Sequence, residues 1–182
     1  MTHKKTCDAE RIAVIENLLR ASRCPIGRTA IMKCLYFLQE VEGLPLGYRF
    51  QLYTYGPYDP RVLTDLDMAE ALGRLRSKLT VYGNGNEGYL YSVKTKQSAD
   101  IDAKWQEAIE RVVRNFACRT VSDLEAASTI VFVDHYHFRR EQTIDEDALV
   151  NEITSIKSHL TPERVRGEIE KLRNLGYLKA LP

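Results

Sequence analysis

The sequence has almost no net charge, no long apolar run and no secretion signal. Its 26 basic and 25 acidic side chains leave a formal net charge of +1 over 182 residues. A strongly basic nucleic-acid binder has a domain pI above about 9, so only a local basic patch could serve that function here. No apolar run approaches the ~20 residues that a membrane span needs, and residues 1–8 lack the apolar core of a signal peptide. We therefore expect a cytoplasmic protein with no membrane partner.

The sequence motifs of common enzymes are also missing. No GxSxG, P-loop, HExxH or GxGxxG pattern occurs. Asp134, His135 and His137 have the chemistry of metal ligands, but on a helix the two histidines would point about 200° apart, and no third ligand has a useful spacing. We expect no enzyme activity, no cofactor and no metal. An enzyme that uses these three side chains remains a third hypothesis.

The four cysteines are scattered along the chain at positions 7, 24, 34 and 118, without a CxxC pair. In a cytosolic chain, such cysteines are expected to be free thiols, some of them in the core. A zinc site or a disulfide framework is the alternative.

The composition indicates a folded, soluble protein of one ordinary domain or two small ones, because 44% of the residues are apolar and 28% are charged. Apolar residues at helical spacing predict helices over about residues 8–22, 28–41 and 60–72. Two β-rich segments, 75–82 and 89–93, flank a loop of Gly and Asn and predict a β-hairpin.

The stretch from Tyr48 to Pro60 joins these elements. Its apolar and polar residues alternate up to Tyr53, which predicts a short half-buried strand. Gly56 and Pro57 are expected to end this strand, because proline has no N–H to donate and glycine opens a turn. Asp59 followed by Pro60 is a helix-start pattern.

Three helices, a strand and a hairpin in this order form the winged-helix pattern, a helix-turn-helix variant with a β-wing. We therefore predict an α+β, mainly helical protein with a winged-helix-like module over residues 7–95. Residues 100–182 are predicted to be a helical module packed on the first as one unit. Its helices are expected over about 101–116, after the capping boxes at Ser122 and Thr143, and from Pro162. A strand is the alternative at 129–133, and a short strand is expected at 177–181.

The aromatic residues near the Gly-Pro turn are candidates for binding a partner. Tyr53, Tyr55 and Tyr58 could provide rigid contact area for a protein or stack on bases, or they could simply pack around the turn. Lys33 lies on the helix over 28–41, which could contact a partner or only fill the core. The apolar faces of 101–116 and 129–133 make a homodimer possible.

A basic patch surrounds the predicted hairpin. It has five cations and a single acid, Glu87; the cations are Arg74, Arg76, Lys78, Lys94 and Lys96. Such a patch could hold phosphates. The alternative is an ordinary edge hairpin whose lysines block edge-to-edge pairing.

Three segments of the chain together resemble known proteins. Residues 30–39 (Ala-Ile-Met-Lys-Cys-Leu-Tyr-Phe-Leu-Gln), followed by Tyr48-Arg49-Phe50 and by the Tyr-Thr-Tyr-Gly-Pro-Tyr-Asp-Pro run from Tyr53 to Pro60, resemble the YwgA-like uncharacterised bacterial proteins. More remotely they are similar to the Panacea (SocA-like) antitoxin domain, with its Lys-Leu-Leu-Tyr helix and Gly-Pro turn. The second resemblance implies a protein-binding module that neutralises a toxin or acts as an adaptor.

Two functional hypotheses follow. The first is a non-enzymatic bacterial regulatory or interaction protein that binds a protein partner through the tyrosines. The second is a DNA-binding winged-helix transcription regulator that uses the basic hairpin.

Overall fold

The computed structural model describes residues 7–81, 85, 87–96 and 99–181. It is an α+β protein, mainly helical, and the chain forms two compact units. The first comprises Met1–Phe50 and Tyr58–Val121, and the second comprises Gln51–Pro57 and Ser122–Pro182. Along the chain, the boundaries between the two units therefore fall after Phe50, after Pro57 and after Val121.

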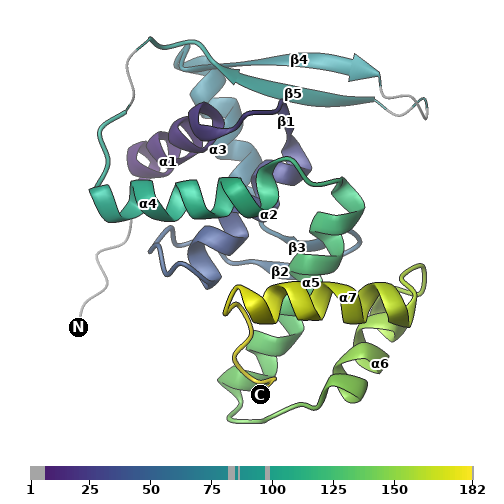
Figure 1. The fold of residues 1–182 in the computed structure, drawn as a ribbon. Helices are drawn as coiled ribbons and strands as arrows, with labels where there is room; N and C mark the ends of the chain where they lie inside the picture. The colour runs from purple at the N-terminus through teal and green to yellow at the C-terminus, as the bar shows by residue number, and fades with distance from the viewer. Residues whose placement is uncertain (1–6, 82–84, 86, 97–98, 182) are drawn as a thin grey trace. The chain divides into compact units, whose positions relative to one another are not determined.

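The first unit contains five helical segments and one sheet among its described residues. In chain order the elements are α1 (Asp8–Ala21), β1 (Ile26–Gly27), α2 (Arg28–Glu40), α3 (Arg61–Ala71), β4 (Leu75–Val81), β5 (Glu87–Val93), α4 (Ala103–Val112) and the π-helix η1 (Val113–Ala117). The sheet is antiparallel with the order β1-β5-β4. Its β4–β5 hairpin, the long ribbon in Figure 1, pairs Leu75 with Val93 and Val81 with Glu87. The three N-terminal helices and the hairpin are thus confirmed at the level of secondary structure.

The core of the first unit is built around α2. Every residue of this helix from Ala30 to Leu38 is buried. The ring of Phe37 stacks on that of Phe116 with centroids 4.0 Å apart, which fixes η1 against α2. Ile109 and Val112 are fully buried as well. The apolar face of 101–116 is therefore already covered within the chain and gives no reason to expect a dimer.

The second unit consists of a short hairpin and three helices. Its elements are β2 (Gln51–Tyr53), β3 (Gly56–Tyr58, of which Tyr58 belongs to the first unit), α5 (Val121–Arg139), α6 (Glu146–Ile156) and α7 (Pro162–Asn174). Residues 129–133 are helical, so the alternative of a strand there is wrong, and all of them except half-buried Phe132 are buried. Among the described residues, no helix is long and apolar enough to cross a membrane.

Three local predictions in the second unit are wrong for identifiable reasons. Gly56 and Pro57 do not end the strand region but begin β3, which pairs with β2. Helix α6 is capped by Asp145, whose carboxylate accepts the N–H of Ala148 at 2.9 Å, and not by Thr143. The predicted strand at 177–181 is absent, because the carboxylate of Asp134 accepts the backbone N–H groups that a strand would use, those of residues 179–181.

The cysteines also differ from expectation. Cys24 and Cys118 form a disulfide, with Cα atoms 5.8 Å apart, whereas Cys7 and Cys34 are free. Both members of the pair belong to the first unit. Burial raises the pKa of the Cys34 thiol to about 12, so this side chain behaves as an inert core residue. The pairing could not be foreseen, because 94 residues separate the two cysteines in sequence.

A buried ion pair connects α1 to α3. The Arg11 Nε donates to Asp65 Oδ2 at 2.8 Å, and the hydroxyl of Tyr48 donates to the same oxygen at 2.6 Å. Arg11 and Asp65 are both buried. The hydrogen bond to Asp65 raises the pKa of Arg11, while burial, followed by the bond to Asp65, raises the pKa of the Tyr48 phenol. The three groups form one interior polar network that keeps Arg11 charged and Tyr48 neutral.

The substitution Asp65→Ala tests the importance of this network. It leaves a buried guanidinium and a buried hydroxyl without their acceptor, so we expect a loss of about 3–5 kcal/mol of unfolding free energy. The control is Asp8→Ala, which removes the exposed partner of the same arginine and should cost less than about 1 kcal/mol. Urea unfolding followed by circular dichroism measures both, and equal losses for the two variants would contradict the prediction.

Candidate functional site

The structure separates the four residues predicted to bind a partner. Tyr53 and Tyr55 are 66% and 64% exposed, the two largest exposed fractions among the large hydrophobic side chains described. Tyr58 is half-buried and belongs to the first unit, whereas Tyr53 and Tyr55 belong to the second. Lys33 is only 2% exposed. Its side chain is therefore buried in the interior of the first unit and offers no contact surface. The candidate site is therefore built on the turn between β2 and β3.

A buried lysine fixes the backbone of this turn. The ammonium group of Lys157 donates to the carbonyl oxygens of Tyr53 and Thr54, the first at 3.0 Å. It also forms an ion pair with Glu125, with Lys157 Nζ 3.0 Å from Glu125 Oε1. The side chains of Lys157 and Glu125 are 5% and 6% exposed. Three negative or partly negative groups thus surround one buried ammonium, which satisfies its charge and holds the turn in place.

The same turn is held from its other end by Gly56. This residue has φ +83°, and a Cβ atom added to it would lie 3.0 Å from Ser128 Oγ and 3.1 Å from Thr129 Oγ1. Both hydroxyls belong to α5, which approaches the turn too closely for any larger residue. Glycine is needed here for its backbone conformation and for the space. The turn that carries the exposed tyrosines is consequently rigid at both ends.

An open cleft of about 650 Å³ lies beside the turn, within the second unit. Its lining includes Tyr53 and Tyr55 from the turn, and Ile156 and His159 from the end of α6 and the loop after it. We call these four residues the tyrosine surface. His159 is exposed and its Nε2 lies 3.5 Å from Glu125 Oε2.

The cleft combines one buried ion pair with apolar and aromatic side chains. Lys157 offsets the charge of Glu125, so the deepest polar groups of the cleft are nearly neutral as a pair. The lining offers aromatic and aliphatic area around them. Shape and apolar contact therefore dominate what this surface can recognise.

The histidine cluster suggested as a third hypothesis is not assembled. His135 and His137 lie on α5, where His135 is buried with Nε2 3.1 Å from the carbonyl oxygen of Tyr177. His137 Nε2 lies 2.9 Å from Glu152 instead. Asp134 is engaged by backbone N–H groups. Within the described part of the chain, no group of three or more His, Cys, Asp or Glu side chains could hold a metal ion.

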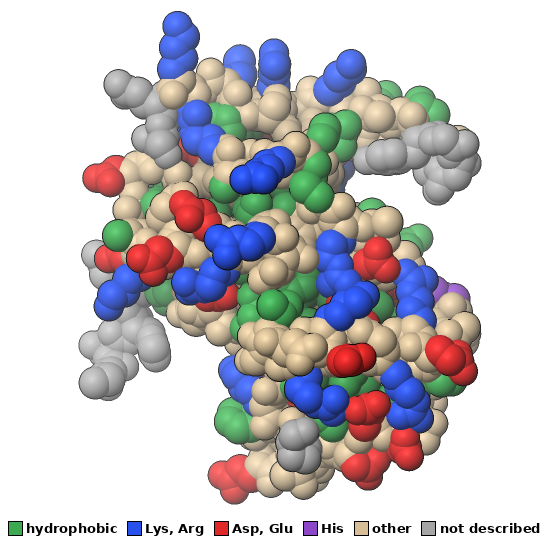
Figure 2. Space-filling view, viewed as in Figure 1, with side chains coloured by type: hydrophobic (Ala, Val, Ile, Leu, Met, Phe, Trp, Pro, Cys, Tyr) green, Lys and Arg blue, Asp and Glu red, His purple; other side chains and the backbone are tan. Residues whose placement is uncertain are grey.

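The cations of the hairpin divide into two groups. Arg74 is ion-paired at 2.6 Å with Glu16, a fully buried carboxylate of α1, and so has a structural role. The other four predicted cations are exposed: Arg76, Lys78, Lys94 and Lys96. Figure 2 shows Lys and Arg side chains standing along the β4–β5 region at the top of the view. This is a basic edge without the buried anchoring seen at the turn.

Neither the lysine nor the glycine contact could be foreseen from the sequence. Lys157 follows an apolar helical stripe, and nothing in its sequence neighbourhood indicates its partners. Its partners lie 103 and 104 positions earlier in the chain. The Gly-Pro dipeptide lies directly after the turn, at the start of β3, and carries no information about what covers the turn.

Replacing Gly56 tests the fixed turn. Gly56→Ala adds a methyl group against Ser128 and Thr129 and forces a positive φ on alanine, so we expect about 2–4 kcal/mol of destabilisation. Gly43→Ala is the matched control, because Gly43 has φ +75° but nothing within 4 Å of the added Cβ, and should cost about 1–2 kcal/mol. Chemical unfolding gives both values. If the control lost as much stability as Gly56→Ala, the close approach to α5 would be refuted.

Comparison with known proteins adds no identification. No family model matches the chain, and no curated protein matches it. Function is therefore inferred from the two surfaces described above, the tyrosine surface and the basic edge of the hairpin.

Proposed function

We propose that this chain is a non-enzymatic bacterial regulatory or interaction protein that binds a protein partner through the tyrosine surface. One observation carries the proposal: two neighbouring tyrosines are mostly exposed on a turn whose backbone is fixed by a buried lysine. Tyrosine provides a large amphipathic contact area and is enriched at protein interfaces. Because the turn is already ordered, binding would cost little additional conformational entropy.

The cleft beside the turn supports a protein as the ligand. Its lining combines tyrosine rings with Leu52 and Ile156 around the neutral Glu125–Lys157 pair. Such a lining suits an apolar or aromatic side chain of a partner, which would be buried at the centre of the contact. The resemblance to the Panacea domain agrees with this type of activity and makes a toxin partner, or the client of an adaptor, the first candidate to test.

The proposed module for the first unit is winged-helix-like. Three helices precede the hairpin, and β1 pairs with β5 at one side of it, in keeping with this pattern. The connection from α2 to α3 covers residues 41–60, whereas a helix-turn-helix joins its helices by 3–4 residues. The exposed side chains of α3 include Asp67 and Met68, and its one basic residue, Arg61, is ion-paired with Asp59 at 2.9 Å. This composition suits a protein better than the phosphates of a DNA groove.

The partner hypothesis is tested with the protein encoded by the neighbouring gene. The two chains are co-expressed, purified as a complex and titrated by calorimetry. In the double variant Tyr53→Ala, Tyr55→Ala, we expect the dissociation constant to rise at least about 30-fold, since buried interface tyrosines are worth about 2 kcal/mol or more.

The control for this experiment is Tyr136→Ala, which removes another exposed tyrosine of the second unit that does not line the cleft. Its affinity should stay within about twofold of the unmodified protein. Failure of the two chains to form a complex, or unchanged affinity in the double variant, would count against the proposal.

The exposed edge of the hairpin favours a second candidate, a DNA-binding regulator. Arg76 and Lys78 lie on one face of β4, since side chains two positions apart share a face. Lys94 and Lys96 are exposed just after β5. The strand partners of Arg76 and Lys78 are Ser92 and Leu90, neither of which is acidic. A phosphate backbone could therefore approach this face without meeting a carboxylate from the described part of the hairpin sheet.

This candidate predicts salt-dependent binding to random duplex DNA. Arg76→Ala with Lys94→Ala should weaken binding and lower the slope of log K against log salt by about 2, because two phosphate contacts are lost. Arg49→Ala with Lys104→Ala removes two exposed cations outside the hairpin and serves as the control. Fluorescence anisotropy at low and moderate salt provides the measurement, and absence of any binding at low salt would eliminate this candidate.

A further inference from the structure

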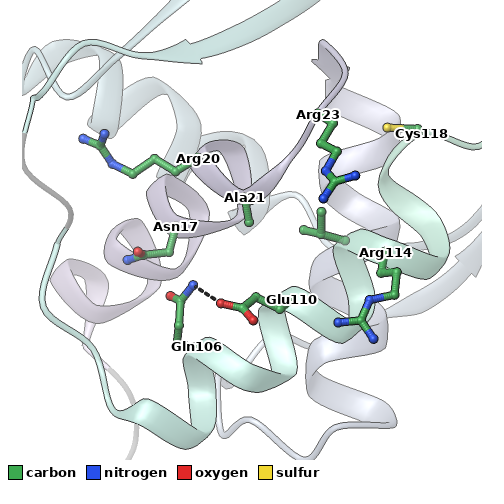
Figure 3. A pocket seen from close by; sticks show the side chains of 9 residues that line it. Asn17, Arg20, Ala21, Arg23, Gln106, Glu110, Arg114 and Cys118 are labelled. Atoms are coloured by element: carbon green, nitrogen blue, oxygen red, sulfur yellow. Dashed lines mark hydrogen bonds between the residues drawn. The ribbon is translucent and has the colours of Figure 1, made fainter.

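A second cavity lies in the first unit, between α1 and the α4–η1 segment. Its volume is about 650 Å³, within the range of about 300–1,000 Å³ of small-molecule sites. Figure 3 shows the side chains that line it, from α1 and the loop after it on one side and from α4 and η1 on the other. It is separate from the tyrosine surface, which belongs to the second unit.

The lining of this cavity is positively charged. Arg20, Arg23 and Arg114 line it together with a single acid, Glu110. Arg20 donates to Thr95, to the backbone carbonyl and to Oγ1 at 2.7 Å, and so serves the structure. Glu110 accepts a hydrogen bond from Gln106 at 3.1 Å.

Two of the three arginines carry a charge that no ion pair within the described part of the chain offsets. Arg23 and Arg114 are exposed, and no carboxylate of the described residues forms an ion pair with either. In Figure 3 both lie at the end of the cavity where Cys118 is found. Arg23 and Arg114 therefore give one end of this cavity an excess of positive charge, and the cavity is large enough for a ligand.

The backbone around these arginines is unusual in two respects. Arg114 lies on η1, a π-helix. Short π-helical segments are rare in proteins, and where they do occur they are often found at functional sites. Arg23 directly precedes Cys24, whose disulfide to Cys118 ties the loop after α1 to the end of η1. The two segments that carry the arginines are thus joined covalently, which limits their relative movement.

We propose that this cavity binds a phosphate-bearing small molecule, held by Arg23 and Arg114 and organised by the Cys24–Cys118 disulfide. Each guanidinium can donate two parallel hydrogen bonds to phosphate oxygens. Two of them balance the charge of about −2 on a phosphate monoester. The remaining volume accommodates an organic group beside the α4 side chains.

The test uses pyrophosphate as the probe, titrated into the full-length protein by calorimetry at constant ionic strength. We expect saturable binding, weakened at least about tenfold in the double variant Arg23→Ala, Arg114→Ala, because each charge-assisted contact to phosphate is among the stronger hydrogen bonds. The control is again Arg49→Ala with Lys104→Ala, which lowers the net charge by the same amount and should bind within about twofold of the unmodified protein.

The role of the disulfide is tested in the same titration. Dithiothreitol converts Cys24 and Cys118 to thiols and is itself oxidised to a cyclic disulfide; the variant Cys24→Ser, Cys118→Ser reproduces the open state without reductant. Both should bind pyrophosphate several-fold more weakly. Equal binding by the open forms would overturn the organising role of the disulfide. Lack of saturable binding, or an equal loss in the control, would overturn the site.

Discussion

The buried ammonium group of Lys157 is the contact on which the candidate site depends. The chain leaves the first unit for only seven residues, Gln51–Pro57, before Tyr58 returns to it. So short an excursion has little apolar surface with which to hold itself against α5. Its position is fixed instead by two carbonyl oxygens that accept from Lys157 and by a glycine pressed against two hydroxyls of α5. Exposed tyrosines on a loop with no such contacts would be mobile, and their binding would be correspondingly weaker.

The same device recurs in both units, where single buried charges connect segments that are distant in sequence. Asp65 joins α3 to α1 through Arg11, and Glu16 joins α1 to Arg74 at the start of the hairpin. Asp134 holds the C-terminal residues 179–181 by their backbone N–H groups. In each case a carboxylate that would be costly to bury alone is compensated by donors. Balanced overall charge is thus partly a consequence of internal pairing and says little about partners.

Local structure was predictable from the sequence to the extent that it depends on spacing. The stripes of α1, α2 and α3, the two strands of the β4–β5 hairpin, and the Thr161–Pro162 helix start all follow from periodicity, strand patterning and caps; the Gly-Asn loop predicted between the strands lies largely outside the described residues. Features that depend on distant partners were not predictable, such as the disulfide and the burial of Lys33. The candidate site was found in part, because exposed tyrosines beside a turn are a local pattern, whereas the lysine that fixes them is not.

The energetics of the Glu125–Lys157 pair indicate why it is present. A buried ion pair adds little net stability, since desolvation offsets most of the attraction, and apolar replacements are often as stable. A methionine or leucine at position 157 could fill the same space, but it could not donate to the carbonyl oxygens of Tyr53 and Thr54. The charged side chain therefore fixes the backbone of the turn that carries the exposed rings of Tyr53 and Tyr55. Under the proposed function, this fixed backbone would present the two rings to a partner in one orientation.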